Sequence, residues 1–295
     1  LDEGSVDHEN QDTGKTTETY ANQIIATDGS ASVIRRKMGK LEGYKEKMKP
    51  LSHGYKELTI PANENGSFKL ESNVLHIWPR GNYMLIALPN SDGTFTCTLF
   101  FPMKGTPSFA SLDITDKVTH FFGEVFPDAI SYLKNLEEEF FLNETGKLGT
   151  VKSWPWNVED RFLLMGDAAH AIVLFFGQGI NAGFEDCTVL NKCFDEYGDN
   201  WGKVFESFGK HRKPDTDAIA QISLENYIEM RSATTDPKFL IKKEIEFALE
   251  RRFTNRFIPR YSIVAFHRMP YSECLRRGSI QASILDILCS EINSI

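Results

Sequence analysis

Residues 165–181 read MGDAAHAIVLFFGQGIN, and they connect a predicted strand to a predicted helix. The apolar run 161–165 is typical of a buried strand, which would deliver Asp167 to the carboxyl edge of a sheet, where open α/β sheets bind ligands. Small residues then let a flat ligand approach the backbone. The GQG at 177–179 opens a helix whose free N–H groups favour an anion. The stretch therefore predicts a site for a ligand with hydroxyl groups and developing negative charge.

Each part of this pattern has a plainer interpretation when it is taken alone. A GxG before a helix is often only a turn, and an aspartate after a strand is often an N-cap. We expect His170, which follows two alanines, to be a packed and hydrogen-bonded residue rather than a metal ligand or a base. The ordered combination of all seventeen residues is what favours a ligand site.

Residues 54–103 alternate with a period of two and predict an antiparallel sheet. Four apolar segments, each closed by a proline, are separated by turns rich in Asn, Gly and Asp. These segments are 55–60, 73–78, 83–88 and 95–101. Both faces of the third segment are apolar, so we expect this sheet to be covered on both sides, by protein on one and by protein or a ligand on the other.

The remaining elements follow from hydrophobic spacing. We predict a strand at 21–26, a helical turn after Ser32, a helix over 115–143 broken at Pro127, and helices near 202–231 and 237–253. Residues 1–20 are polar and are interpreted as a tail or as a hairpin. The helix that begins near Gly179 has its predicted apolar face at Ile180, Gly183, Phe184, Cys187, Leu190 and Phe194. We expect residues 154–156, Trp-Pro-Trp, in a core or an interface.

Composition excludes several classes of protein. The net charge is 33 − 41 = −8 with no basic block, which argues against a nucleic-acid partner. Five cysteines without a CxxC pair are typical of reduced thiols in a cytoplasmic protein. No apolar run reaches about 18 residues, so we expect no membrane anchor. GxSxG and HExxH are absent, and no ligand spacing predicts a metal site.

Two motifs resemble a known family. GDAAH at 166–170, followed by the GxGxN of 177–181, is similar to the second flavin-contacting motif of class A flavoprotein aromatic hydroxylases, and TDGS at 27–30 resembles their DG motif. Longer blocks narrow the resemblance to the kynurenine 3-monooxygenases within that family, from about Ile24 to about Arg277. These blocks are LHIWPR at 75–80, MLIALPN at 84–90, FTCTLF at 95–100, NAGFEDC at 181–187 and NYIEMR at 226–231.

The resemblance implies a mixed α/β, class A flavoprotein monooxygenase-like fold that hydroxylates L-kynurenine at ring position 3. FAD would be the cofactor, NADPH and O₂ the co-substrates, and a flavin C4a-hydroperoxide the oxygen donor, so no acid–base residue is expected. A homodimer is also expected. The implied domains are 1–40, the end of the FAD-binding domain; 41–155, the substrate domain; 156–200, a return to the FAD-binding domain; and 201–295, a helical region.

The resemblance also implies roles for individual residues. Those expected to bind the cofactor are Asp28, Gly29, Asp167, Gly177, Gly179, Ile180 and Asn181. Those expected to bind the substrate are Asn226, Tyr261, Glu229, Met230, Phe175, Leu75, Met84, Ile86, Leu88 and Phe100. Without the resemblance, the apolar strand face is more simply core, and residues 226–227 are more simply a surface pair.

Two departures from the family pattern leave alternatives open. The GxGxxG unit that binds the ADP half of FAD has no counterpart here, so we expect the chain to be the later part of a longer protein. Leu174 stands where the family has proline beside the flavin, which frees φ and restores an N–H. The alternatives are a hydroxylase of another aromatic compound and an inactive fragment that binds no flavin.

Overall fold

The computed structural model describes residues 5–232 and 236–292 of the chain. The chain divides into two compact units. Unit 1 comprises residues 1–49, 149–224 and 260–279, and unit 2 comprises residues 50–148, 225–259 and 280–295. The 201–295 region, expected as one helical segment, contributes residues to both units.

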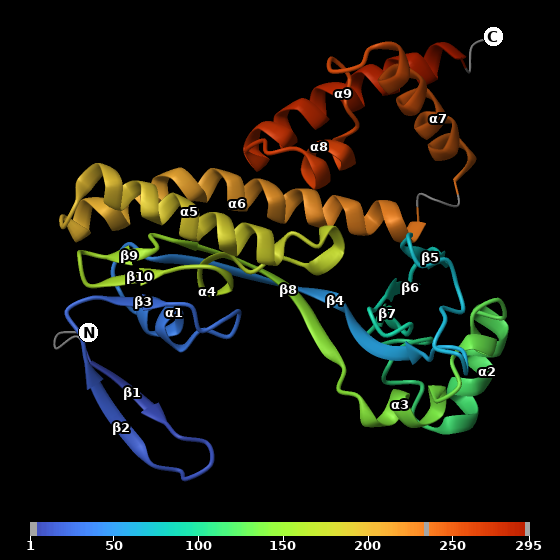
Figure 1. The fold of residues 1–295 in the computed structure, drawn as a ribbon, viewed down its shortest axis with the longest axis horizontal. Coiled ribbons are helices and arrows are strands. Elements are labelled where there is room, and N and C mark those ends of the chain that lie inside the picture. Colours follow the sequence, from blue (N-terminus) through green and yellow to red (C-terminus); the bar gives the residue numbers. More distant parts are fainter. Residues whose placement is uncertain (1–4, 233–235, 293–295) are drawn as a thin grey trace. The chain divides into compact units, whose positions relative to one another are not determined.

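Unit 1 is organised around a three-stranded sheet. β10 (Phe162–Leu164) lies between β3 (Ile24–Ala26), with which it runs parallel, and β9 (Asn157–Val158), with which it runs antiparallel. Both β3 and β10 confirm strands predicted from apolar runs. α5 (Gly179–Tyr197) and the first part of α6 (Trp201–Ser232) lie side by side next to this sheet (Figure 1).

The core of unit 1 joins these strands to both helices. Trp156 is buried and donates its indole N–H to the carbonyl oxygen of Ser153 at 2.9 Å, which confirms the core position expected for it. The other buried members are Ala26, Met38, Leu163, Leu164, Ala168, Ala169, Leu190, Cys193, Val204, Phe205 and Phe208. Burying such apolar side chains stabilises the unit by about 25 cal/mol for each Å² removed from water.

The apolar face predicted for α5 is right at Leu190, which is buried, and at Phe194, which packs against the core, but it is wrong at the start of the helix. The residues that α5 buries are Ala182, Asp186, Leu190 and Cys193, whereas Ile180 and Phe184 are 74% and 69% exposed. The buried face is therefore rotated from the predicted one. Its cause is Asp186, which is drawn inward by two buried partners described below.

Short elements complete unit 1. They are the hairpin strands β1 (Ser5–Glu9) and β2 (Thr16–Tyr20), α1 (Val33–Met38), α4 (Asp167–His170), the 3₁₀ turn η2 (Leu174–Phe176), α8 (Arg260–Phe266) and the first part of α9 (Tyr271–Ile292). β1 pairs antiparallel with β2, which confirms the hairpin interpretation of the polar N-terminal residues.

A five-stranded sheet in the order β5-β6-β7-β4-β8 carries most of unit 2. Its strands are β4 (Lys45–Ile60), β5 (His76–Pro79), β6 (Met84–Pro89), β7 (Phe95–Pro102) and β8 (Gly146–Trp154). Residues 45–49 of β4 and 149–154 of β8 belong to unit 1. β5 pairs with β6, β6 with β7, and β7 with β4, all antiparallel, which confirms the four-strand prediction.

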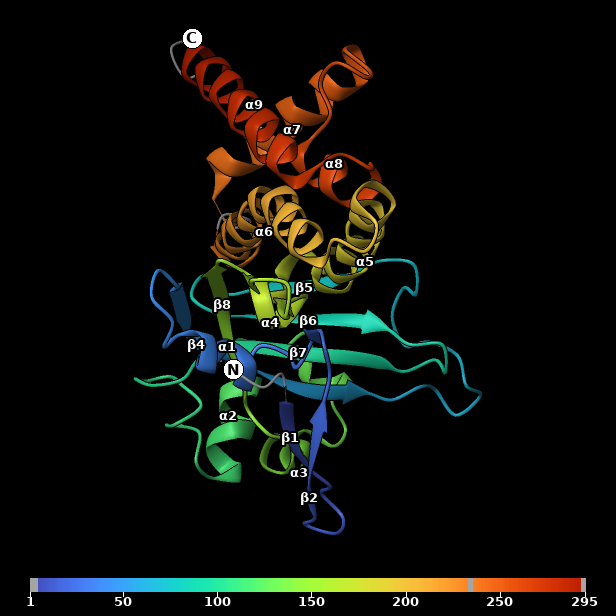
Figure 2. The same cartoon turned by 90° about the vertical axis from the view of Figure 1, so that its left-hand side faces the viewer.

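One face of this sheet packs against α2 (Thr115–Val125), the 3₁₀ turn η1 (Ile130–Tyr132) and α3 (Leu136–Leu142) (Figure 2). α2 ends before Pro127, where the sequence predicted a break. Every second residue of the strands points into this core, among them Leu85, Leu99 and Phe101. α7 (Pro237–Arg252) also belongs to unit 2. Among the helices of the described ranges, none has an apolar stretch suited to crossing a bilayer.

Candidate functional site

The GDAAH turn follows β10 directly. The amide of Met165 donates to the carbonyl oxygen of Ala26 at 3.0 Å, which extends the parallel pairing with β3. Gly166 then adopts φ +61°, which L side chains rarely reach, and the chain turns into α4. Asp167, the first residue of α4, is exposed, whereas the next three residues are buried. A free carboxylate therefore stands at the carboxyl end of β10, where the sequence predicted it.

The N-terminus of α5 faces open space. Gln178 precedes the helix without a side-chain cap to its first amides, and Gly177 has φ +64°. A Cβ atom built on Gly177 or Gly179 would meet nothing within 4 Å. The uncapped amides of Gly179, Ile180 and Asn181 are thus available to acceptor atoms of a flat ligand lying over the glycines.

The Asp28-Gly29 turn has a structural task of its own. One carboxylate oxygen of Asp28 accepts the amide hydrogens of Val33 at 2.7 Å and Ile34 at 3.4 Å, at the start of α1. Burial raises the pKa of Asp28, but hydrogen bonds from Ser32, Val33 and Ile34 outweigh it, and the net shift is downward. Gly29 has φ +79° and open space around it. Asp28 thus caps α1 while remaining exposed, and Gly29 is half-buried.

Arg35 ties the two predicted cofactor segments together, and the sequence offered no sign of it. Its fully buried guanidinium donates to the carbonyl oxygen of Ala168 at 2.7 Å and to that of Ser30 at 2.5 Å. Its Nε pairs with Glu46 at 2.8 Å. One side chain therefore fixes the DG turn against the GDAAH turn.

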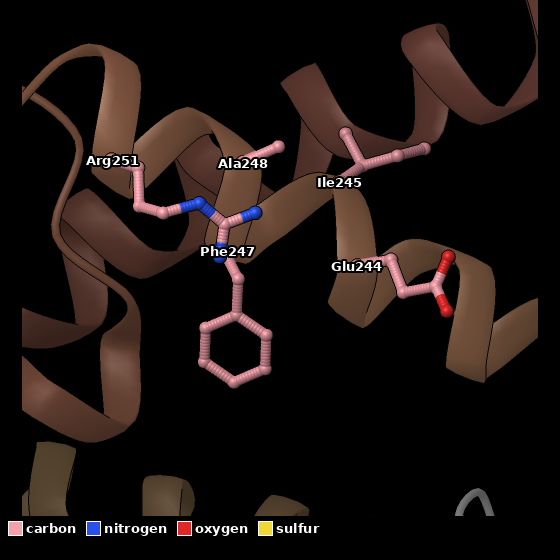
Figure 3. A pocket seen from close by; sticks show the side chains of 5 residues that line it. All are labelled: Glu244, Ile245, Phe247, Ala248 and Arg251. Carbon is pink, nitrogen blue, oxygen red and sulfur yellow. The ribbon is translucent and has the colours of Figure 1, made fainter.

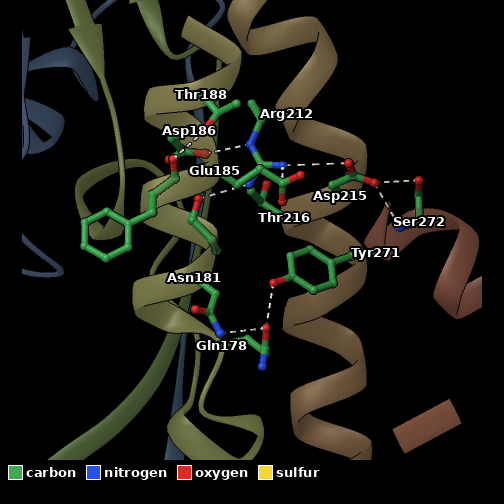
Figure 4. A network of polar contacts seen from close by, with 12 residues as sticks. Gln178, Asn181, Glu185, Asp186, Thr188, Arg212, Asp215, Thr216, Tyr271 and Ser272 are labelled. Carbon is green, nitrogen blue, oxygen red and sulfur yellow. Dashed lines mark hydrogen bonds and ion pairs between the residues drawn. The ribbon is translucent and has the colours of Figure 1, made fainter. Parts of the chain in front are cut away.

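A buried ionic network holds α5 against the GDAAH turn, and Figure 4 shows the part of it that joins Asp186 of α5 to Arg212 of α6. Oδ2 of Asp186 lies 2.6 Å from Nε2 of His170 and accepts the amide of Gly166 at 3.0 Å. Oδ1 accepts from Nε of Arg212 at 2.7 Å. Burial raises the pKa of Asp186, but His170 and Arg212 lower it on balance, so the carboxyl is ionised. The packed, hydrogen-bonded role expected for His170 is confirmed.

Aromatic side chains flank the turn before α5. Phe175 and Phe176 of η2 are buried, and Phe176 stacks on Tyr261 of α8, with ring centroids 5.3 Å apart and planes at 27°. Tyr261 itself is 52% exposed. Within unit 1 the structure therefore places two of the predicted substrate residues, Phe175 and Tyr261, around η2.

The predicted apolar pocket residues share one sheet face in unit 2. Met84 lies opposite Phe100 and Ile86 opposite Thr98, so Met84, Ile86 and Phe100 point away from α2 and α3. Leu75 and Leu88 have the same parity, and they are 40% and 46% exposed. Met84 and Phe100 are fully buried. Only the leucines of this set offer substantial accessible surface.

The end of α6 that belongs to unit 2 covers part of that face. Tyr227 meets His53 edge-on at 5.7 Å between ring centroids and Phe100 at 6.5 Å. Asn226 is buried and donates to the sulfur of Met230 at 3.3 Å. Glu229 pairs with Lys243 of α7 at 2.9 Å. The structure thus gathers Asn226, Glu229 and Met230 beside the sheet, and 226–227 are not a surface pair.

An open hollow of about 480 Å³ lies along α7, and no predicted site residue is among those that line it (Figure 3). Glu244, Ile245, Phe247, Ala248 and Arg251 line it. Its lining offers one carboxylate, one guanidinium and apolar surface, and these do not converge as a binding site would.

Comparison with known proteins identifies close relatives. The sequence matches no protein-family model. It is 48% identical over 272 residues to a kynurenine 3-monooxygenase of Flavobacterium psychrophilum, a match that covers 92% of this chain and 61% of the relative. A kynurenine 3-monooxygenase of Myxococcus xanthus is 48% identical, and the match covers 94% of this chain and 59% of the relative. A kynurenine 3-monooxygenase of Dictyostelium discoideum is 43% identical, and the match covers 94% of this chain and 63% of the relative.

Solved structures agree on the fold. A tetrameric 2-methyl-3-hydroxypyridine-5-carboxylic acid oxygenase is similar with a TM-score of 0.55 at 20% identity, over 86% of this chain and 60% of that one. Klebsiella pneumoniae HpxO, solved with FAD and uric acid, is similar with a TM-score of 0.57 at 15% identity, over 100% of this chain and 64% of that one. The mixed α/β fold expected for a flavin hydroxylase is confirmed. Over about nine tenths of its length the chain is similar to proteins named kynurenine 3-monooxygenase, and it spans about three fifths of the length of these relatives.

Proposed function

We propose that the protein containing this chain hydroxylates L-kynurenine at ring position 3 with NADPH and O₂, using FAD. The observation that carries the proposal is the 48% identity, over 92% of the chain, to a relative named kynurenine 3-monooxygenase. The fold shared with flavin hydroxylases supports the reaction class. Asn226, Glu229 and Tyr261 favour kynurenine over another aromatic substrate, because their polar groups would contact its amino and carboxylate groups.

The residues of unit 1 fit a flavin. The exposed carboxylate of Asp167 would accept hydrogen bonds from the ribityl hydroxyls. The amides of Gly179, Ile180 and Asn181 would hold the pyrimidine edge, where the dipole of α5 stabilises negative charge. Gly177 would allow close approach, with the Asp28-Gly29 turn nearby. When bound, FAD supplies the electron transfer from NADPH and the activation of O₂.

The protein's own work is to orient the substrate and to exclude water. We propose that Asn226 and Tyr261 contact the polar end of kynurenine, with Glu229 and Met230 nearby and Phe175 beside the flavin. Leu75 and Leu88 would contact the aryl ring, because they are the exposed members of the apolar face. Met84, Ile86 and Phe100, which are buried, would support that surface from below.

The test uses the complete protein. Purified with FAD, it is incubated with NADPH and either L-kynurenine or 4-hydroxybenzoate, and the products are separated by chromatography. We expect 3-hydroxykynurenine from the first and no hydroxylated product from the second. Hydroxylation of 4-hydroxybenzoate alone would favour the other-aromatic alternative. An FAD titration of the present chain, followed by flavin fluorescence, tests the inactive-fragment alternative separately.

Two finer points belong to the same proposal. A cytoplasmic location is supported by the five cysteines, all of which are free thiols in the structure. A homodimer is supported by Ile280, Ile284 and Ile287, which α9 exposes at 50%, 42% and 60%. Fractionation of the source cells checks the first, and sedimentation of the complete protein checks the second.

A further inference from the structure

The first turn of α9 is anchored on the turn that precedes α5 (Figure 4). The hydroxyl of Tyr271 donates to Oε1 of Gln178 at 2.8 Å, and both side chains are buried. The next residue, Ser272, donates its backbone N–H and its hydroxyl to one oxygen of Asp215 on α6, at 2.9 and 2.6 Å. α9 is therefore fixed both to α6 and to the Gly177–Gly179 turn.

Gln178 passes this constraint to a predicted cofactor residue. Its Oε1 also accepts from Nδ2 of Asn181 at 3.1 Å. An amide oxygen has two lone pairs, so Tyr271 and Asn181 together fill its capacity. Because Asn181 turns its nitrogen toward Gln178, its carbonyl oxygen points away from the turn. The orientation of the Asn181 amide at the N-terminus of α5 thus depends on a hydroxyl 90 residues further along the chain.

We propose that Tyr271 is a positioning residue for the flavin site, acting through Gln178 on the side chain of Asn181. This inference rests on the proposed function. Burial raises the pKa of Tyr271 to about 12, so its hydroxyl remains a donor across the working pH range. A donor at this position keeps Oε1 of Gln178 directed at Tyr271 and Asn181. Without it, the Gln178 amide keeps its bonds to Asn181 at 3.1 Å and to the Phe176 carbonyl oxygen at 3.4 Å but loses the shortest of the three, so it is held less firmly.

The test compares FAD binding in variants of the complete protein. Tyr271→Phe keeps the ring and removes the hydroxyl, and we expect the Kd for FAD to rise about 3- to 10-fold, the usual effect of one lost buried hydrogen bond. The visible absorption bands of the bound flavin should shift as well. Tyr197→Phe, on the opposite end of α5, is the matched control and should leave both unchanged.

A double-mutant cycle separates positioning from a general loss of stability. In a Gln178→Leu background, Tyr271→Phe should raise the Kd no further, because its route to Asn181 is gone. Amide hydrogen exchange of residues 174–181 in the apoprotein should accelerate in Tyr271→Phe but not in Tyr197→Phe. This second measurement applies even where a variant binds FAD too weakly to titrate.

The outcomes distinguish this inference from the proposed function. An unchanged Kd and unchanged exchange in Tyr271→Phe would overturn it, as would an equal effect in the Gln178→Leu background. A wild-type protein that binds FAD but leaves L-kynurenine unmodified would refute the substrate while the positioning role stands. A wild-type protein that binds no FAD would refute both.

Discussion

Replacement of Asp186 by asparagine probes the network that joins α5 to the GDAAH turn. Asp186 is fully buried and accepts hydrogen bonds from His170, Gly166 and Arg212. Arg212 is only 1% exposed at its side chain. Asparagine is nearly isosteric, so it removes the charge and one acceptor without leaving a cavity. The variant therefore measures electrostatics rather than packing.

The magnitude follows from what remains around Arg212. Removing one partner of a buried ion pair costs about 3–5 kcal/mol, because the other charge stays buried. Here Arg212 retains Glu185 at 3.2 Å and Asp215 at 3.7 Å, and Glu185 is 44% exposed. Because these two carboxylates still offset part of the Arg212 charge, we expect a loss of unfolding free energy at the lower end of that range, about 3 kcal/mol. Against a typical stability of about 5–15 kcal/mol, that loss is a large fraction.

Urea unfolding at pH 7 measures the loss, with Glu206→Gln as the control. Glu206 pairs with Lys210 on α6, but both are exposed, and we expect no measurable change. The lowered pKa of Asp186 adds a second signature. The stabilisation that ionised Asp186 provides is complete above the ordinary aspartate pKa of about 3.9, and it is lost as the pH falls through the lower pKa that Asp186 has in the folded protein. The unfolding free energies of wild type and variant should therefore converge in acid. A difference below about 0.5 kcal/mol at pH 7 would refute the reasoning.

Three further predictions concern other parts of the chain. Arg35→Lys retains the charge but cannot reach Ser30, Glu46 and the Ala168 carbonyl together, so unfolding should become easier by about 2–4 kcal/mol in urea, with weaker FAD binding. Leu174→Pro should raise the free energy of unfolding by about 0.4–1 kcal/mol, because Val173, at φ −70° and ψ 148°, already has the backbone conformation that suits a following proline. The same variant should lower the hydrogen peroxide formed per NADPH in the complete protein, and an unchanged peroxide yield would contradict this second effect. Burial and the charge of Arg231 lower the pKa of His53, although its hydrogen bond to the Asn82 carbonyl oxygen opposes this. The wild-type free energy of unfolding should therefore decline as the pH falls from about 6.5 toward the lower pKa that His53 has in the folded protein. His53→Gln should reduce this pH dependence in urea unfolding measured from pH 5 to 8.

Local pattern was a reliable guide wherever neighbours in sequence are neighbours in space. The alternation in 54–103 predicted strands that the structure confirms, with Met84, Ile86 and Leu88 on one face of β6. The break at Pro127 and the start of α5 at Gly179 were also correct. Strand alternation and helix spacing act over a few residues, so a short window contains the cause of each.

Long-range polar partners were not predictable in this way. Arg35 and Ala168 are 133 residues apart, and Tyr271 and Gln178 are 93 apart. Nothing in the residues around Arg35 distinguishes a buried arginine from an exposed one. Gln178 lies inside the 165–181 stretch, but the role inferred for it depends on its hydrogen bond to Tyr271. The residues around Tyr271 predict only the start of a helix.

The error on α5 shows which sequence signal was overlooked. Ala182, Asp186, Leu190 and Cys193 recur at helical spacing, but a search for apolar residues alone does not find this face, because it contains a carboxylate. A charge among apolar neighbours is costly unless it is paired, so such a face is buried only where a cation awaits it. Arg212 lies on the next helix and His170 just before, and both were visible in the sequence. A face that combines one acid with apolar spacing should therefore be weighed together with the bases on adjoining elements. By that rule the face that contains Asp186 is the buried one, and Ile180 and Phe184 near the start of the helix are left exposed.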